Sequence, residues 1–275
     1  MNDAPFSSLL QQIAAIARDA AEAILVVYGQ DFEVERKQDH SPVTAADLAA
    51  QRVITAGLAE LDDVLPVISE EARAAPWSQR REWQRYWLVD PLDGTREFVK
   101  RNGEFTVNIA LIDQHEPVLG VVLAPVTGEL YVAARGEGAW LQRSADAGWQ
   151  RIGTRDLPEP ATVAGSRSHG ASGVALLQQL IGDDYQSLPM GSSLKFCLVA
   201  RGDADVYLRR GATSEWDTAA AQSVLEEAGG AVLDLAGVPL RYNRGDSLLN
   251  PEFIAVGDAS IDWKARLQAA DLDAS

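Results

Sequence analysis

Cysteine and histidine are nearly absent from this 275-residue chain, which contains one cysteine, Cys197, and three scattered histidines. A single cysteine excludes a disulfide framework and any zinc or iron–sulfur site built from several thiolates. The three histidines show none of the spacings that zinc enzymes use. Any metal site in this chain would therefore be built from oxygen ligands.

Positive charge is also scarce, because 24 Lys and Arg residues stand against 40 Asp and Glu residues, a formal net charge of −16. Such an acidic surface repels phosphate backbones and anionic lipids, so we expect no nucleic-acid polymer as a partner. The first residues lack a basic, apolar leader, and no uncharged run is long enough to span a bilayer. We therefore expect a cytoplasmic protein without an integral membrane segment.

Apolar residues make up 47% of the chain, which is enough for a full core. Helical periodicity predicts one helix over residues 6–29 and another that begins at Thr44. Short β-rich runs between residues 64 and 134 predict a mostly antiparallel sheet, whereas strands and helices alternate after residue 160. We expect two joined units, an α+β half over residues 1–155 and an α/β half over residues 156–275.

The boundaries of the expected elements follow from the same patterns. In the first half the expected strands are Val64–Ser69, Tyr86–Asp90, Phe105–Ile112, Val118–Ala124 and Glu129–Ala134. In the second half the expected strands are Ala161–Gly165, Asp205–Arg209, Ala231–Leu235 and Phe253–Val256. The expected helices there are Gly173–Ile181, Leu194–Ala200, Trp216–Ala228 and Ile261–Ala270.

Two aspartates follow an apolar strand in the segment Trp87–Thr95. We expect Pro91 to stop the strand and Gly94 to permit an unusual backbone conformation. Asp90 and Asp93 would then project from a sharp loop, where a hard cation could bind both carboxylates. An ordinary acidic turn is the alternative.

Acidic residues mark two further element ends. A second apolar run ends in Glu70 and Glu71, and Asp217 stands at the start of a predicted helix, where it could equally be a cap. Asp47 has the same alternative, because it completes a Thr-x-x-Asp capping pattern. Taken together, these element ends predict an oxygen-only site suited to Mg²⁺. Two such ions can stabilise both the attacking and the leaving oxygen of a phosphoryl transfer.

Gly94 and Thr95 also precede a predicted helix, whose first N–H groups could hold phosphate oxygens. The chain has neither the P-loop nor the Rossmann glycine pattern, so nothing in it supports a nucleoside triphosphate or a dinucleotide cofactor. Hydrolysis of a phosphate monoester is the chemistry that this arrangement of residues favours.

Two segments, Trp87–Thr95 and Trp216–Ala220, closely resemble the signatures of the inositol monophosphatase superfamily. The acids at 70–71 and the capping pattern at Thr44 stand where that family has them, and the resemblance covers about Lys37–Gly230. It implies a layered αβαβα sandwich of the inositol monophosphatase/fructose-bisphosphatase type. It also implies a magnesium-dependent phosphatase with its metal ions between the two halves.

Within this superfamily the chain most resembles the bacterial 3'(2'),5'-bisphosphate nucleotidases of the CysQ type. Three stretches carry that choice: Lys37–Asp47, Gly191–Cys197 and Ser214–Asp217. Lys195, on the first turn of a predicted helix beside Ser193, could bind a second phosphate or a ribose. The alternative is a solvated surface lysine.

The resemblance implies site residues in both halves, with two or three Mg²⁺ ions. The implied metal ligands are Glu70, Asp90, Asp93 and Asp217, joined by the Leu92 carbonyl. The implied catalytic residues are Asp47, Thr95 and Glu70. The implied substrate contacts are Glu70, Leu92, Asp93, Gly94, Thr95, Ser193, Lys195 and Asp217. Glu71 stays outside the ligand set, either reaching a third ion through water or facing solvent.

The implied reaction removes the 3'-phosphate of adenosine 3',5'-bisphosphate in sulfur assimilation, with 3'-phosphoadenylyl sulfate as a second candidate substrate. An inositol or sugar phosphatase of the same fold is one alternative, and a non-catalytic metal or nucleotide sensor is another. The segments Gly165–His169 and Arg209–Arg210 are either substrate contacts or solvated polar stretches. A homodimer and a peripheral position at the cytoplasmic face of the inner membrane are both compatible with the resemblance.

Overall fold

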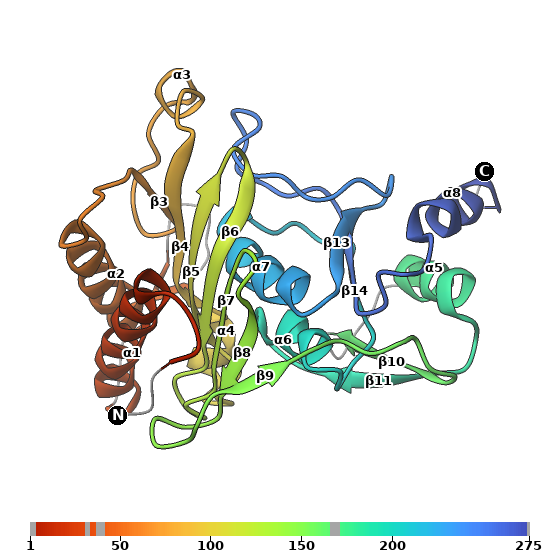
Figure 1. The fold of residues 1–275 in the computed structure, drawn as a ribbon, viewed down its shortest axis with the longest axis horizontal. Coiled ribbons are helices and arrows are strands. Elements are labelled where there is room, and N and C mark those ends of the chain that lie inside the picture. Colours follow the sequence, from red (N-terminus) through yellow and green to blue (C-terminus); the bar gives the residue numbers. More distant parts are fainter. Residues whose placement is uncertain (1–3, 31–33, 37–41, 166–170, 274–275) are drawn as a thin grey trace.

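The computed structural model describes residues 4–30, 34–36, 42–165 and 171–273. Within these ranges two β-sheets and their covering helices alternate as five layers (Figure 1). The order is two helices, a seven-stranded sheet, two helices, a five-stranded sheet and two helices. The expected αβαβα sandwich is therefore confirmed.

The seven-stranded sheet is formed by the first half of the chain, in the order β3-β4-β5-β6-β7-β8-β9. Its strands are β3 (Val67–Ser69), β4 (Arg85–Asp93), β5 (Thr106–Asp113), β6 (Glu116–Leu123), β7 (Leu130–Ala134), β8 (Gly138–Gln142) and β9 (Gln150–Ile152). Strand β3 is parallel to β4, and the other neighbours are antiparallel. A short antiparallel pair, β1 (Val34–Arg36) and β2 (Pro42–Thr44), lies outside this sheet.

Both faces of the seven-stranded sheet are buried, because its central strands carry apolar side chains at successive positions. In β4, Trp87 and Val89 face the layer of α1 (Ser8–Tyr28) and α2 (Ala45–Ala59). Tyr86 and Leu88 face the opposite layer. Strand side chains alternate between faces, so an uninterrupted apolar run identifies a strand covered on both sides.

The second half of the chain forms the five-stranded sheet, in the order β11-β10-β12-β14-β13. Its strands are β10 (Ala161–Gly165), β11 (Tyr185–Pro189), β12 (Val206–Arg209), β13 (Ala231–Asp234) and β14 (Phe253–Val256). Helices α5 (Ala171–Ile181) and α8 (Trp263–Asp273) cover its outer face. Helices α6 (Leu194–Ala200) and α7 (Ala219–Glu227) fill the layer between the two sheets.

Several expected boundaries are wrong at the element ends that matter for function. Strand β4 does not stop at Pro91 but continues to Asp93, with a register shift between Asp90 and Asp93. Such an irregularity accommodates a proline, which has no N–H for the ladder. The expected strand Val64–Ser69 is limited to its last three residues. The expected helix Trp216–Ala228 is divided into a 3-10 turn, Glu215–Asp217, and α7.

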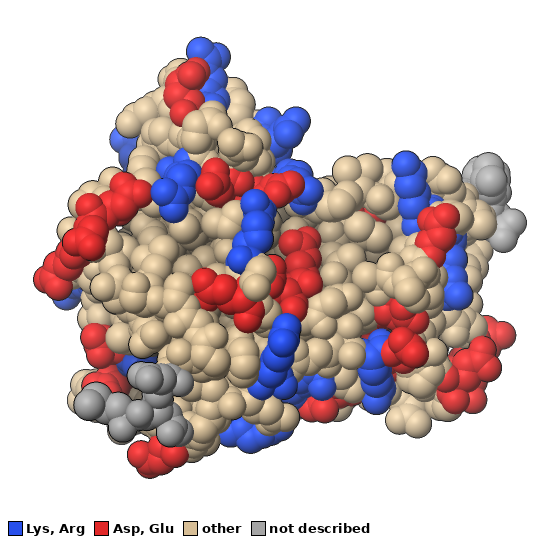
Figure 2. Space-filling model, in the orientation of Figure 1, with Lys and Arg blue, Asp and Glu red and all other residues tan. Residues whose placement is uncertain are grey.

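The charged side chains of the described residues are mixed rather than segregated on the face drawn in Figure 2. Lys and Arg side chains lie between Asp and Glu side chains, so this face offers no broad basic surface to a polyanion. Among the described residues no helix combines the length and the apolar character needed to cross a bilayer.

Gly120 in β6 is a point of close approach between the middle helix layer and the seven-stranded sheet. A Cβ at this position would lie 2.1 Å from the Ala220 carbonyl oxygen and 2.8 Å from the Ser223 Cβ of α7. The helix backbone therefore rests directly on the strand backbone, and only glycine leaves room for that contact.

Replacing this glycine tests the close approach. We expect Gly120→Ala to lower the free energy of unfolding by about 1–3 kcal/mol, because α7 must move away from the sheet. Urea unfolding measures the difference. Gly245→Ala is the matched control, since a Cβ at Gly245 meets nothing within 4 Å. Equal stability of Gly120→Ala and the wild type would contradict the packing described here.

Candidate active site

The end of β4 places two aspartates and a helix start together. Asp90 is buried, and its Oδ1 accepts a hydrogen bond from the Leu92 N–H at 3.0 Å. Asp93 pairs with Thr106 of β5 beyond the register shift. Gly94 follows with φ of 94°, a left-handed conformation that favours glycine, and it caps the short helix α4 (Thr95–Val99). The irregular strand end thus delivers both carboxylates to one edge of the sheet.

Asp47 lies beside this strand end, and its two carboxylate oxygens accept hydrogen bonds from different residues. Its Oδ2 accepts hydrogen bonds from the Thr44 N–H at 2.8 Å and the Thr44 hydroxyl at 2.7 Å. Its Oδ1 accepts a hydrogen bond from the Thr95 hydroxyl at 3.3 Å. The predicted capping box at Thr44 is therefore present, and it fixes Asp47 so that one oxygen remains directed at Thr95.

Asp217 comes from the second half of the chain, at the end of the 3-10 turn between the sheets. Its Oδ2 accepts a hydrogen bond from the Ser214 N–H at 2.9 Å, so the capping role weighed from the sequence is real. The same side chain lines the cavity that Asp93 lines, so capping and a site role are both compatible with its position.

Four carboxylates of this region act on one another electrostatically. Burial is the main cause that raises the pKa of Asp93 to about 6 and the pKa of Asp217 to about 8, and the charge of Glu70 raises both further. The pKa of Asp90 lies well above its usual range, through burial and then through Glu70, Asp93 and Asp217. Asp90 and Glu70 also share a side-chain hydrogen bond. Such a group of acids stays ionised together only when a cation compensates its charge.

The donor set of this cluster fits a hard cation, since it consists of carboxylate oxygens without a nitrogen or sulfur ligand. In the part of the chain that the structure describes, no three Asp, Glu, His or Cys side chains are already arranged to close around an ion. A cation would therefore have to reorient the carboxylate side chains, on a backbone that stays in place, as it displaced their protons.

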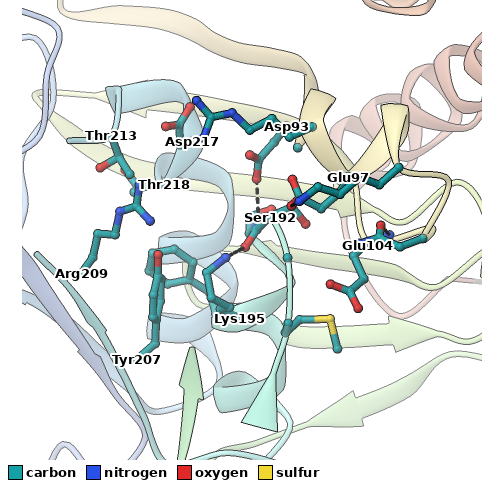
Figure 3. A pocket seen from close by; sticks show the side chains of 18 of the residues that line it. Asp93, Glu97, Glu104, Ser192, Lys195, Tyr207, Arg209, Thr213, Asp217 and Thr218 are labelled. Carbon is teal, nitrogen blue, oxygen red and sulfur yellow. Dashed lines mark hydrogen bonds and ion pairs between the residues drawn. The ribbon is translucent and has the colours of Figure 1, made fainter. Parts of the chain in front are cut away.

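A cavity of about 520 Å³ opens beside the carboxylates (Figure 3). Of the residues predicted for the site it is lined by Asp93, Gly94, Ser193, Lys195 and Asp217. The other predicted residues do not line the cavity: Glu70 and Asp90 belong to the carboxylate cluster, and Asp47, Leu92 and Thr95 lie next to it. The structure thus brings the carboxylates of Asp93 and Asp217 and the ammonium group of Lys195 to one cavity between the two halves of the chain.

Lys195 is not the solvated surface lysine that the sequence left open, because only 8% of it is exposed. Its Nζ donates a hydrogen bond to the Ser192 carbonyl at 2.5 Å and lies 5.2 Å from the centre of the Tyr207 ring. Burial lowers the pKa of Lys195, while the charge of Asp93 opposes that shift. Its ammonium group is thus held at the cavity wall (Figure 3).

Ser193 lines the cavity and is buried, and its polar groups bind neighbouring side chains. Its N–H donates to Asp93 Oδ2 at 2.6 Å, and its hydroxyl donates to Asn108 Oδ1 at 2.9 Å. The Thr106 hydroxyl, 2.8 Å away, is left to donate to the Ser193 oxygen. Ser193 thereby fixes the orientation of Asp93 from the opposite half of the chain.

Further cavity residues were not identified from the sequence, or were identified only in part. Arg209 lines the cavity from β12, whereas Arg210 forms an ion pair with Glu252 at 2.8 Å and does not line it. Tyr207 and Glu104 also line it, and neither belongs to a recognisable motif. Strand alternation explains why Tyr207 and Arg209 both line the cavity, because residues two apart in β12 point to the same side.

Some sequence expectations lie on residues that the structure does not describe. Residues 37–41, at the start of the Lys37–Asp47 stretch, and residues 166–170, which contain most of the Gly165–His169 stretch, are outside the described residues. Glu71 lies in the turn after β3 and is partly buried.

A family model described as "Inositol monophosphatase family" matches residues 7–266 of the chain. The "3'(2'),5'-bisphosphate nucleotidase CysQ" of Salmonella typhimurium is 51% identical over 247 residues, 89% of this chain and 98% of that protein. The CysQ protein of Escherichia coli K12 is 50% identical over the same lengths. That of Aggregatibacter actinomycetemcomitans is 37% identical over 93% of this chain and 95% of its own.

Solved structures agree with these relatives. The crystal structure of CysQ from Bacteroides thetaiotaomicron, described as a bacterial member of the inositol monophosphatase family, superposes with a TM-score of 0.79 and 40% identity. It covers 92% of this chain and 98% of its own. An inositol monophosphatase from Thermotoga maritima superposes with a TM-score of 0.77 at 23% identity, covering 98% and 100% of the two chains, and so supports the fold alone.

The raised pKa of Asp217 makes the stability of the metal-free protein dependent on pH. The folded protein holds a proton on Asp217 that the unfolded chain releases, so stability falls as the pH rises from about 4 to about 8. In EDTA at pH 8, we expect Asp217→Asn to be more stable than the wild type by about 1–3 kcal/mol. Urea unfolding at both pH values measures this.

Asp146→Asn, at an exposed position, serves as the control and should leave the pH dependence of stability unchanged. A metal-free Asp217→Asn protein that is less stable than the wild type at pH 8 would contradict repulsion among the buried acids.

Proposed function

The chain belongs to the inositol monophosphatase family, and from that premise we propose that it is a 3'(2'),5'-bisphosphate nucleotidase. It removes the 3'-phosphate of adenosine 3',5'-bisphosphate, giving AMP and inorganic phosphate, in sulfur assimilation. The observation that carries this function is the identity of about 50% with CysQ nucleotidases, combined with a cavity that holds acids and a buried lysine side by side. We propose 3'-phosphoadenylyl sulfate, which carries the same 3'-phosphate and a phosphate–sulfate anhydride at the 5' position, as a second substrate.

The proposed metal ligands are the four carboxylates whose charges act on one another. Glu70, Asp90, Asp93 and Asp217 would hold two or three Mg²⁺ ions together with the Leu92 carbonyl. When bound, the ions supply positive charge for the phosphate and lower the pKa of a water. Because the two proposed halves, divided at residue 155, each contribute ligands, the proposed metal site would lie where the halves meet.

Asp47 and Thr95 are proposed to orient the attacking water. The Thr95 hydroxyl donates its proton to Asp47 Oδ1, so the lone pairs of that hydroxyl are left to accept a hydrogen bond from water. Burial raises the pKa of Asp47, and its hydrogen bonds from Thr44 oppose that shift. Asp47 therefore orients the hydroxyl and can receive the proton that passes through it.

The substrate is proposed to bridge the two sides of the cavity. The N–H groups of Gly94 and Thr95 would hold the 3'-phosphate beside the carboxylates, because the left-handed glycine turns the chain at that point. Lys195, with Arg209 on the same wall, would bind the 5'-phosphate. An inositol monophosphate has no second phosphate, so a buried lysine here favours the bisphosphate over the alternative substrate.

Phosphate release tests the reaction and its metal dependence. We expect strong Mg²⁺-dependent release from adenosine 3',5'-bisphosphate and far slower release from inositol 1-phosphate. Asp93→Asn should reduce the rate about 10³-fold, because a proposed metal ligand is lost, while circular dichroism shows an intact fold. Asp146→Asn is the surface control.

A preference for inositol 1-phosphate would keep the mechanism and reject the nucleotide substrate. No release from either compound, with metal binding retained, would instead support a metal or nucleotide sensor.

Lys195→Met tests recognition of the second phosphate. We expect the ratio of kcat/KM for adenosine 3',5'-bisphosphate to kcat/KM for adenosine 3'-monophosphate to fall about 10–100-fold, through loss of a charge-assisted hydrogen bond. Taking the ratio cancels any effect of Lys195 on Asp93. Arg210→Met removes a partly exposed charge that pairs with Glu252 and should leave the ratio unchanged. An unchanged ratio in Lys195→Met would place the 5'-phosphate elsewhere.

A further inference from the structure

Arg80 is a buried charge whose hydrogen-bond acceptors lie in the other half of the chain. It ends the short helix α3 (Trp77–Arg80), which precedes β4, and only 2% of it is exposed. Its guanidinium donates to Asn243 Oδ1 at 2.5 Å, to the Gly245 carbonyl at 2.8 Å and to the Asp246 carbonyl. A buried guanidinium with three acceptors in one loop fixes that loop to its own helix.

Asn243 connects this arginine to the turn that carries a proposed metal ligand. Its Nδ2 donates back to the Arg80 carbonyl at 2.7 Å. Its N–H lies within hydrogen-bond distance of both carboxylate oxygens of Glu215, at 2.9 and 2.8 Å. Glu215 is buried and begins the 3-10 turn that ends at Asp217. Asn243 has φ of 53°, so the loop takes a special backbone conformation at this point.

Other residues of the loop that contains Asn243 form hydrogen bonds with the turn that carries Asp217. The Glu215 N–H donates to the Leu248 carbonyl at 2.8 Å. Asn250 Nδ2 donates to the Ser214 carbonyl at 2.7 Å and to the Thr218 hydroxyl at 3.1 Å. Residues 243–250 therefore surround the Asp217 turn, and Arg80 ties one end of that loop to the half that carries Asp90 and Asp93.

We propose that Arg80 is a positioning residue: through Asn243 it holds the turn that carries Asp217 at a fixed place relative to β4. Ligands contributed by two halves bind one ion well only if their separation is fixed before the ion arrives. Arg80 touches neither substrate nor ion and acts only by setting that separation. This inference rests on the proposed function, in which Asp217 is a metal ligand.

The test is direct metal binding, measured as the dissociation constant of Mn²⁺ by electron paramagnetic resonance at a temperature where every variant is folded. We expect Arg80→Met to weaken Mn²⁺ binding about tenfold or more and to raise the half-saturating Mg²⁺ concentration for activity in parallel. Arg81→Met, at the C-cap directly after α3, is the control, because Arg81 is exposed and pairs with its neighbour Glu82.

A second variant keeps the test informative if Arg80→Met does not fold. Asn243→Gly suits the positive φ and retains the N–H to Glu215, but it removes both side-chain hydrogen bonds to Arg80. We expect this variant to weaken Mn²⁺ binding in the same direction. A lower thermal midpoint with wild-type Mn²⁺ affinity in both variants would overturn the positioning role.

The variant Asp217→Asn distinguishes failure of the positioning role of Arg80 from failure of the proposed metal site. Loss of Mn²⁺ binding in Asp217→Asn, with wild-type binding in Arg80→Met and Asn243→Gly, rejects the positioning role and keeps the proposed site. Wild-type Mn²⁺ binding in Asp217→Asn rejects the proposed ligand set itself.

Discussion

Repulsion among buried carboxylates is the constraint on which the candidate site depends. Burial raises the pKa of Asp90, Asp93 and Asp217, and the charge of Glu70 raises all three further, so a site without a cation must keep protons that a cation would displace. The surrounding structure opposes this repulsion with directed donors. The Ser193 N–H binds Asp93, and the Ser214 N–H binds Asp217. A cluster of buried acids of this kind lowers the stability of the folded protein when it is ionised without a cation.

The fold was largely predictable from the sequence because periodicity reports burial. The apolar run of β4 and the helical stripe of α1 both identified elements that the structure confirms. The strands β8 and β9 were not predicted, since their short, mixed sequences carry little periodic signal. The irregular end of β4 was also missed, because a proline normally ends a strand and only the pairing with β5 shows that it continues.

The site residues came from motifs, whereas residues outside the motifs were either not identified, as for Tyr207, or left with two alternatives, as for Arg209. Asp90, Asp93 and Asp217 stand in specific signatures, whereas Tyr207 and Arg209 reach the cavity only because β12 lies beside α6 in space. The burial of Lys195 likewise depends on packing against Tyr207, which no spacing in the sequence reveals. Tertiary neighbours, not local pattern, determine which polar side chains face a cavity.

The contact of Gly120 with the backbone of α7 also limits how the molecule can move. At the point where the two backbones touch, α7 cannot move toward the strand without steric overlap, so the contact opposes relative movement of the middle helix layer and the seven-stranded sheet. A sliding movement between these two layers is therefore disfavoured by the contact at Gly120.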